Sequence, residues 1–214
     1  MVQKRKADLP EEKSRALLLD AAKKLFAKQG FDGTTVRDIA QEAGVNLSLV
    51  SYYFEGKEGL YRSCLEQFGK ARLAMVQRLL APVDSVSELR LRFRMAVEEI
   101  VSVQIQNPEL SQMIHREIDC NLPIAQKTFE ETFLRVFQAW VDFFRHASEK
   151  GLIRPGIDPL SLAQVVQGAL NNLVRVDPVR QRFYNLTVKN PVHREHLLDN
   201  LVNIILSGCL ETRP

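Results

Sequence analysis

Long apolar runs are missing from this chain of 214 residues, although 45% of its residues are hydrophobic. A membrane-spanning helix needs about 18 consecutive apolar residues, and no stretch approaches that length. The amino-terminal stretch MVQKRKADLPEEKSR has basic residues but no apolar segment after them, so it does not look like a secretory signal. We therefore predict a cytoplasmic protein that has no membrane partner and can fill a hydrophobic core.

Cysteine is also scarce. Cys64, Cys120 and Cys209 are odd in number, far apart and without a C-x-x-C spacing, which excludes a zinc knuckle and a disulfide framework. We expect three reduced thiols in or near the core. His193 and His196 have a spacing that could bind a metal, but no fourth ligand is apparent near them. We predict neither a metal site nor a cofactor.

A strong charge of one sign is missing as well. The net charge is only +3, which is weak evidence for a nucleic-acid partner. The cluster Lys4, Arg5 and Lys6 is more suggestive, because a basic arm in front of a DNA-binding domain can reach phosphates. A solvated tail explains the cluster equally well. We predict that residues 1–10 form a disordered basic arm.

Strand signals are nearly absent, since no Asn-Gly or Asp-Gly turn lies between two alternating apolar runs. Apolar residues recur instead at spacings of three and four, which predicts an all-α fold with about nine helices in all. Segment 177–191 gives no clear pattern. Apart from two short helices described next, the predicted helices span residues 11–29, 57–80, 86–106, 108–118, 124–150, 159–176 and 192–211.

Two short helices joined by residues 43–46 form a predicted helix-turn-helix. The first follows a cap at Thr34 or Thr35, and Gly44 supplies the positive φ that a tight turn needs. Asn46 caps the second helix, which spans Leu47–Tyr53 and fits the major groove of DNA. The predicted core residues here are Val36, Ile39, Val45, Val50 and Phe54.

Residues 18–61 strongly resemble the TetR family of bacterial regulators. The matching residues are Phe26, Gly30, Thr34, Thr35, Ile39, Ala40, Ala43, Gly44, Val45, Tyr52, Phe54, Lys57 and Leu60. The resemblance implies a three-helix DNA-binding bundle with a helix-turn-helix over residues 11–56 and a connecting helix over 57–81. It also implies a larger ligand-binding and dimerisation domain over 82–214.

The resemblance also implies DNA contacts. Thr35 and Arg37 would contact phosphates or base edges, and Tyr53 and Lys57 would contact phosphates, with the helix dipole assisting Lys57. The outward face of the recognition helix would carry Leu47, Ser48, Leu49 and Ser51. The family usually has Tyr where this chain has Ser51, and leucine cannot hydrogen-bond a base. We therefore expect few base contacts, with shape and phosphates contributing more.

Aromatic residues are concentrated in the middle of the chain, and several share one face of a predicted helix. They are either ordinary core or the lining of a cavity between helices. The resemblance implies a cavity without saying which residues line it. His115, Asn171 and Arg175 would orient a polar ligand group or serve only structural contacts. The candidates are Phe93, Met113, His115, Phe133, Phe137, Trp140, Phe144, Asn171 and Arg175.

The last two predicted helices have broad apolar faces. The resemblance implies that these helices pair with their mates across a two-fold axis, as a four-helix bundle in a homodimer. The predicted interface residues are Leu162, Val165, Val166, Ala169, Leu201, Ile204 and Ile205.

These observations predict a DNA-binding transcription regulator. We expect a homodimer that binds a palindromic operator in double-stranded DNA as a repressor, and that a small, largely apolar effector releases. An activator of the same fold and a helical protein-interaction module are the alternatives. An enzyme is not expected, because the sequence contains no nucleophile elbow, P-loop or informative carboxylate pair.

Overall fold

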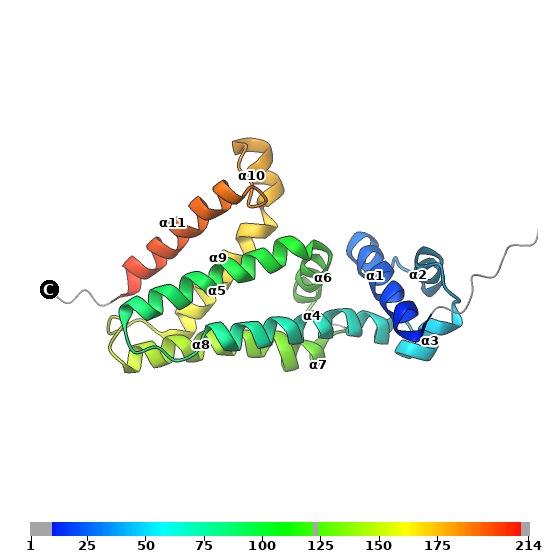
Figure 1. Cartoon of the computed structure of the whole chain (residues 1–214), viewed down its shortest axis with the longest axis horizontal. Coiled ribbons are helices and arrows are strands. Elements are labelled where there is room, and N and C mark those ends of the chain that lie inside the picture. Colours follow the sequence, from blue (N-terminus) through cyan, green and yellow to red (C-terminus); the bar gives the residue numbers. More distant parts are fainter. Residues whose placement is uncertain (1–9, 122–123, 211–214) are drawn as a thin grey trace, which may run out of the picture. The chain divides into compact units, whose positions relative to one another are not determined.

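The computed structural model describes residues 10–121 and 124–210, and the predicted basic arm lies outside them except for Pro10. The chain is all-helical, as predicted (Figure 1). Within the described residues the only extended pairing is an isolated antiparallel bridge between Ile153 and Leu210. No helix in this part of the chain is long and apolar enough to span a bilayer.

The helix boundaries agree closely with those predicted. Differences of one or two residues occur at several ends, which is the usual scatter of helix termini. The elements are α1 Glu11–Gln29, α2 Val36–Ala43, α3 Ser48–Phe54, α4 Lys57–Leu79, α5 Val86–Gln106, α6 Pro108–Asp119, α7 Gln126–Thr128, a π-helical turn Phe129–Phe133, α8 Leu134–Glu149, α9 Pro159–Arg175, α10 Asp177–Tyr184 and α11 Pro191–Cys209.

The chain divides into two compact units. The first unit comprises the residues up to Gly69 together with Pro108–Phe129, and the second comprises Lys70–Asn107 with the residues from Glu130 onward. The predicted division at residue 82 therefore needs correction for α6, which packs on α1 within the first unit. Arg116 of α6 donates a hydrogen bond to the carbonyl oxygen of Phe26 at 3.0 Å.

An aromatic cluster forms the centre of the first unit. The ring of Phe26 lies 4.9 Å from that of Tyr61 and 5.9 Å from that of Phe31. Burial and the neighbouring Glu117 carboxylate raise the pKa of Tyr61. Because Glu117 also accepts a hydrogen bond from the backbone N–H of Ala125 at 3.0 Å, it ties α6 to the start of α7.

Trp140 is at the centre of the second unit. Its ring lies 5.6 Å from Phe93 and 5.7 Å from Phe144, and all three side chains are fully buried. The helix predicted over 124–150 is interrupted by the π-helical turn, which its apolar spacing did not reveal. Cys64 and Cys209 are buried as expected, but Cys120, which follows the last residue of α6, is exposed.

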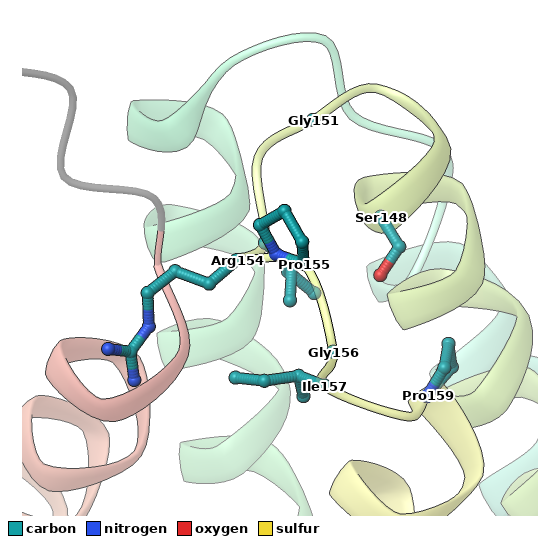
Figure 2. A pocket seen from close by; sticks show the side chains of 8 residues that line it. Ser148, Gly151, Arg154, Pro155, Gly156, Ile157 and Pro159 are labelled. Carbon is teal, nitrogen blue, oxygen red and sulfur yellow. The ribbon is translucent and has the colours of Figure 1, made fainter.

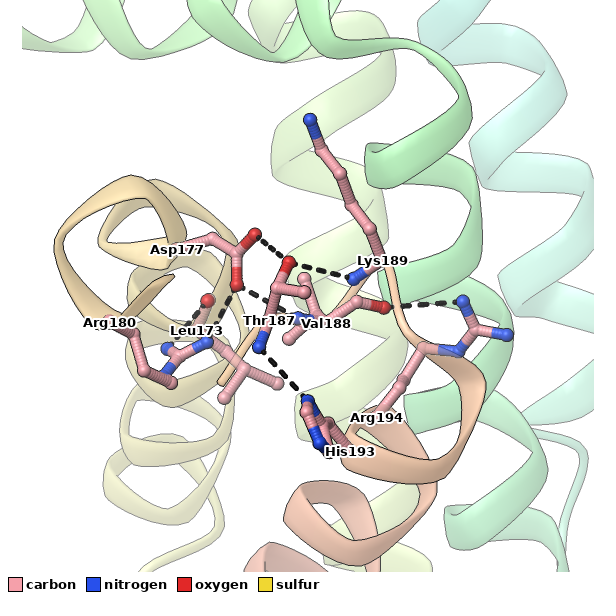
Figure 3. Close-up of polar contacts among 8 residues, drawn as sticks. All are labelled: Leu173, Asp177, Arg180, Thr187, Val188, Lys189, His193 and Arg194. Atoms are coloured by element: carbon pink, nitrogen blue, oxygen red, sulfur yellow. Dashed lines mark hydrogen bonds and ion pairs between the residues drawn. The ribbon is translucent and has the colours of Figure 1, made fainter. Parts of the chain in front are cut away.

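Helix α10 fills part of the segment left unassigned by the sequence. Asp177, at its first position, is buried and accepts hydrogen bonds from Thr187 Oγ1 at 2.7 Å and the Val188 backbone N–H at 2.9 Å. Arg180 donates to the same carboxylate at 3.0 Å and to the carbonyl of Leu173 at 2.8 Å. Figure 3 shows how one carboxylate thus joins α10 to the loop before α11.

Candidate nucleic-acid interface and effector site

The start of α2 is fixed by a reciprocal cap. The Thr35 hydroxyl accepts a hydrogen bond from the Asp38 backbone N–H at 3.1 Å and donates to the Asp38 carboxylate at 2.6 Å. The backbone N–H of Thr35 donates to that carboxylate at 3.2 Å. These hydrogen bonds hold the pKa of Asp38 below its usual range. The Thr35 side chain predicted to contact DNA is therefore engaged in positioning α2.

The turn between α2 and α3 has the predicted geometry. Gly44 has a φ of 65° in the left-handed region, where a Cβ would be strained, and its N–H bonds back to α2. The backbone N–H of Val45 donates to the Ala40 carbonyl at 3.1 Å. Ile39 is fully buried, whereas Val36 and Val45 are half-buried and only partly fulfil their predicted core role.

Helix α3 has one buried and one exposed face. Val50 and Phe54 are buried, as predicted. The Asn46 carboxamide accepts hydrogen bonds from the backbone N–H and the hydroxyl of Ser48, both at 2.9 Å, so Asn46 stabilises the helix start although the helix begins one residue later than predicted. Among the predicted base-reading residues, Leu47, Ser48 and Ser51 are exposed and Leu49 is half-buried.

Tyr52 is an exposed residue that the predicted contacts omitted. Its side chain is 73% accessible, and its ring lies 5.0 Å from that of Tyr53. Tyr53 is half-buried, and loss of hydration raises the pKa of its phenol. Tyr52 and Tyr53 are adjacent on a short helix, so at least one of the two rings is exposed. This adjacency was the signal in the sequence for an exposed aromatic ring.

Lys57 has a structural role that the sequence did not reveal. Its Nζ atom donates hydrogen bonds to the carbonyl oxygens of Phe31 at 2.9 Å and Thr34 at 3.0 Å. The ammonium also lies 4.1 Å from the centre of the Phe31 ring, which is a cation–π distance. The predicted phosphate clamp thus has one of its three N–H donors left, because two are bonded to the loop before α2.

The approach of α4 to α3 depends on Gly59. A Cβ at this position would lie 1.7 Å from the carbonyl oxygen of Phe54 at the end of α3. The connection also uses Glu55 and Gly56, with φ values of 59° and 107°. Only glycine fits at position 59 without moving backbone, so this residue fixes where the recognition helix ends.

The candidate effector residues fall in both units. Met113, which is buried, and His115, which is half-buried, are on α6 in the first unit. In the second unit Phe133 is buried, Phe137 packs against the core and Arg175 is exposed. Asn171 accepts a hydrogen bond from Gln167 at 3.0 Å.

Sequence reasoning missed Arg72 and Gln104, which are among the buried polar residues of the second unit. The available signal was a polar side chain at an apolar-stripe position: Arg72 lies four residues before buried Val76, and Gln104 four after buried Ile100.

A pocket of about 460 Å³ lies at the connection between α8 and α9 (Figure 2). Its wall is mostly loop, and none of the predicted effector residues contributes to it. The lining residues are Ser148, Gly151, Ile153, Arg154, Pro155, Gly156, Ile157 and Pro159.

The residues predicted for the dimer interface differ in exposure within the single chain. Leu162, Val166 and Ile205 are buried within the hydrophobic core of the chain itself. Val165 and Ile204 are 60% and 72% accessible. Ala169 and Leu201 are half-buried.

The chain is similar to known regulators. Residues 18–64 match the profile of a family described as bacterial regulatory proteins, tetR family. The chain is 31% identical over 101 residues to the probable HTH-type transcriptional regulator YttP of Bacillus subtilis (strain 168), a match that spans 47% of this chain and 48% of that protein.

Two further matches extend over nearly the whole chain. The HTH-type transcriptional regulator RutR of Escherichia coli (strain K12) is 24% identical over 198 residues, covering 89% of this chain and 88% of that one. The fold matches the ketosteroid transcriptional regulator KstR2 of Mycobacterium tuberculosis with a TM-score of 0.70 and 20% identity, covering 99% and 100% of the two chains. With the helix-turn-helix geometry above, these matches show that the chain carries a DNA-binding domain of the kind found in bacterial regulatory proteins of the tetR family, and that its overall fold is similar to that of such regulators.

Proposed function

We propose that the chain acts in the cytoplasm as a homodimeric repressor that a small effector releases from a palindromic operator. The observation that carries the proposal is that helix α3 has one buried face and one exposed face. Its inward Val50 and Phe54 are fixed in the core of the first unit, while Ser48 and Ser51 face outward without burial. A short helix that is held from behind and exposed in front suits insertion into a major groove.

The proposed DNA contacts divide by chemistry. Ser48 and Ser51 offer hydroxyl groups to base edges or phosphates, and Leu47 offers methyl groups to thymine. Arg37 is exposed in the first turn of α2, where its charge can pair with a phosphate. We propose that Tyr53 and the remaining N–H of Lys57 also contact the backbone. Thr35 and Lys57 contribute further by holding the loop and α2 in place.

The proposed homodimer uses the exposed apolar side chains of the last helices. Val165 on α9 and Ile204 on α11 expose apolar surface to water in the single chain. Burying these side chains against a second copy would remove that surface from water. Two copies related by a two-fold axis would present two α3 helices to half-sites one or more DNA turns apart. Val165→Glu combined with Ile204→Glu should convert the dimer to monomer, as measured by light scattering.

Binding to DNA is tested by selecting sequences from a random duplex pool with the full-length chain and measuring the affinity for those recovered. We expect a near-palindrome and an affinity that falls steeply with salt. Arg37→Ala should weaken binding at least fivefold on all duplexes and reduce the salt slope by about one. Arg145→Ala, which changes an exposed arginine of the second unit, is the matched control.

The other assignments give different results. A chain that recovers no duplex at low salt would be a protein-interaction module. An activator would bind the same palindrome, but deleting its gene would lower, not raise, transcription from the adjacent promoter.

A further inference from the structure

The core of the second unit contains a cation without a partner. Arg72 on α4 is 7% exposed, and neither its Nε nor its Nη2 atom has a hydrogen-bond partner among the described residues. Its neighbours Leu73 and Val76 belong to the hydrophobic core. Burial alone lowers the pKa of its guanidinium to about 10, with no carboxylate offsetting the loss of hydration. A buried arginine is normally paired with a negatively charged group, so the burial of Arg72 indicates that an anion binds beside it.

The other unpartnered polar atoms of this unit are also mainly donors. They are Nε2 of Gln104 on α5 and Nε1 of Trp140 on α8, whereas Oε1 of Gln167 on α9 is the one unpartnered acceptor in the described part of the chain. Each of these side chains lies beside residues of the same hydrophobic core. Buried N–H groups are rarely left unbonded. Gln104 is eleven residues after Phe93, the α5 residue that contacts Trp140, which is about 16 Å along the helix. The donors of Arg72 and Trp140 therefore remain as the pair that could share one bound group of acceptor atoms.

Arg72 on α4 and Trp140 on α8 lie at similar distances along their helices from one end of the second unit. His146 Nε2 lies 3.1 Å from the Val83 carbonyl oxygen, which brings the region after α4 and the carboxyl-terminal part of α8 together. Arg72 precedes the end of α4 by seven residues, and Trp140 precedes His146 by six. At 1.5 Å per residue, each is about 10 Å back along its helix from that end of the unit.

We propose that this core holds the head group of an organic acid, with the carboxylate paired to Arg72 and with the Trp140 N–H group as a further donor. The inference rests on the proposed effector-binding function and names the chemical class of the effector. The acid has one negative charge, because Arg72 is the one buried cation in the described part of the second unit. Its body is apolar, because the core that contains Phe93 and Val76 is hydrophobic. Water could satisfy the N–H groups but could not offset the charge.

The test measures thermal unfolding of the full-length chain, without DNA, against matched pairs of probes. The pairs are octanoate and octanamide, benzoate and benzamide, and phenylacetate and phenylacetamide, with octyl phosphate as a dianion. We expect at least one carboxylate to raise the Tm saturably and to bind at least tenfold more tightly than its amide. Arg72→Met should weaken that carboxylate at least tenfold, and Arg145→Met should not change it.

Two further variants keep the test decisive if Arg72→Met does not fold. Arg72→Lys keeps the charge but loses the planar fork, and Trp140→Phe removes the N–H while keeping a ring; each should weaken the carboxylate at least threefold. Equal effects of acids and amides, or tighter binding of octyl phosphate, would overturn the inference. Because DNA is absent from these measurements, a failure to bind duplexes would refute the proposed function without affecting this result.

Discussion

The two units differ in how the polar groups of their proposed binding regions are bonded. In the first, polar side chains that shape the DNA-binding surface are bonded nearby, as in the Thr35–Asp38 cap and the Lys57 bonds to two carbonyls. In the second, Arg72 and the Trp140 N–H are buried without partners. The first unit therefore has its binding geometry before DNA arrives, whereas the core of the second is electrostatically incomplete until an acceptor enters it. Pre-organisation favours tight binding, and an unsatisfied core favours a response to ligand.

The largest expected effect is on the pre-organised unit. Gly59→Ala should destabilise the chain by about 3 kcal/mol, because the added methyl overlaps the Phe54 carbonyl oxygen and the backbone must shift. Urea unfolding followed by circular dichroism measures the loss, and duplex affinity should fall with it. Gly208→Ala is the control: a Cβ there meets no described atom within 4 Å, so its stability should stay the same or rise slightly. Equal stabilities for the two variants would show that α3 and α4 do not approach as described.

In the core of the second unit we expect a substitution to raise the stability of the chain. Arg72→Met should stabilise the ligand-free chain by about 2 kcal/mol, since it replaces an unpaired buried cation by an apolar side chain of similar length. The comparison is made by urea unfolding at one protein concentration, after ligand has been removed by unfolding and refolding. A loss of stability would mean that Arg72 already has a stabilising partner, and the contrast between the units would fail.

Substitution of Lys57 tests whether one side chain both supports the loop before α2 and contacts DNA. Lys57→Met should lower the unfolding free energy by about 1.5 kcal/mol, because two carbonyl groups lose a charged donor. The salt slope of duplex binding should also become shallower by about one if the third N–H meets a phosphate. Lys24→Met alters an exposed lysine of α1 and should leave stability unchanged. A lower stability with an unchanged slope would leave Lys57 as scaffold alone.

The smallest effect concerns the exposed cap of α2. The hydrogen bonds from Thr35 lower the pKa of Asp38 in the folded chain, so its stabilising contribution is present above the unfolded pKa of about 3.9 and is lost as the pH falls through the lower folded value. Asp38→Asn should therefore reduce the slope of stability against pH below about pH 4. Parallel pH profiles for the two proteins would show that the cap does not depend on the carboxylate charge.

Sequence reasoning located the first unit well because its signals are local. Gly44, the threonine cap and the apolar spacing of α1 and α2 act within a few residues, and the helix boundaries follow from them. It misjudged Lys57, because the carbonyl groups that bind its ammonium lie 26 and 23 residues earlier in the chain. Gly59 was overlooked for a different reason: the Phe54 carbonyl that constrains it is only five residues earlier, but its approach depends on the backbone path between α3 and α4.

Sequence reasoning was less informative about the second unit, where the decisive partners are distant. Helix α10 was not predicted, because what stabilises its start is the Asp177 carboxylate bonding to Thr187 and Val188 ten and eleven residues later. The one local signal for Arg72 is its place four residues before Val76 on the apolar stripe, and this spacing alone does not show that the side chain is buried. Its burial follows from the packing of several helices, which no single stretch of sequence encodes.

The membership of α6 in the first unit bears on how the regulator can be dissected. The unit is discontinuous, and the backbone passes between the two units after Gly69, Asn107 and Phe129. A fragment that stops at Gly69 would lose Arg116, which bonds to the Phe26 carbonyl, and Glu117, which neighbours Tyr61. The first unit is thus not a contiguous segment of the chain. It can form completely only after the chain has been synthesised through Phe129.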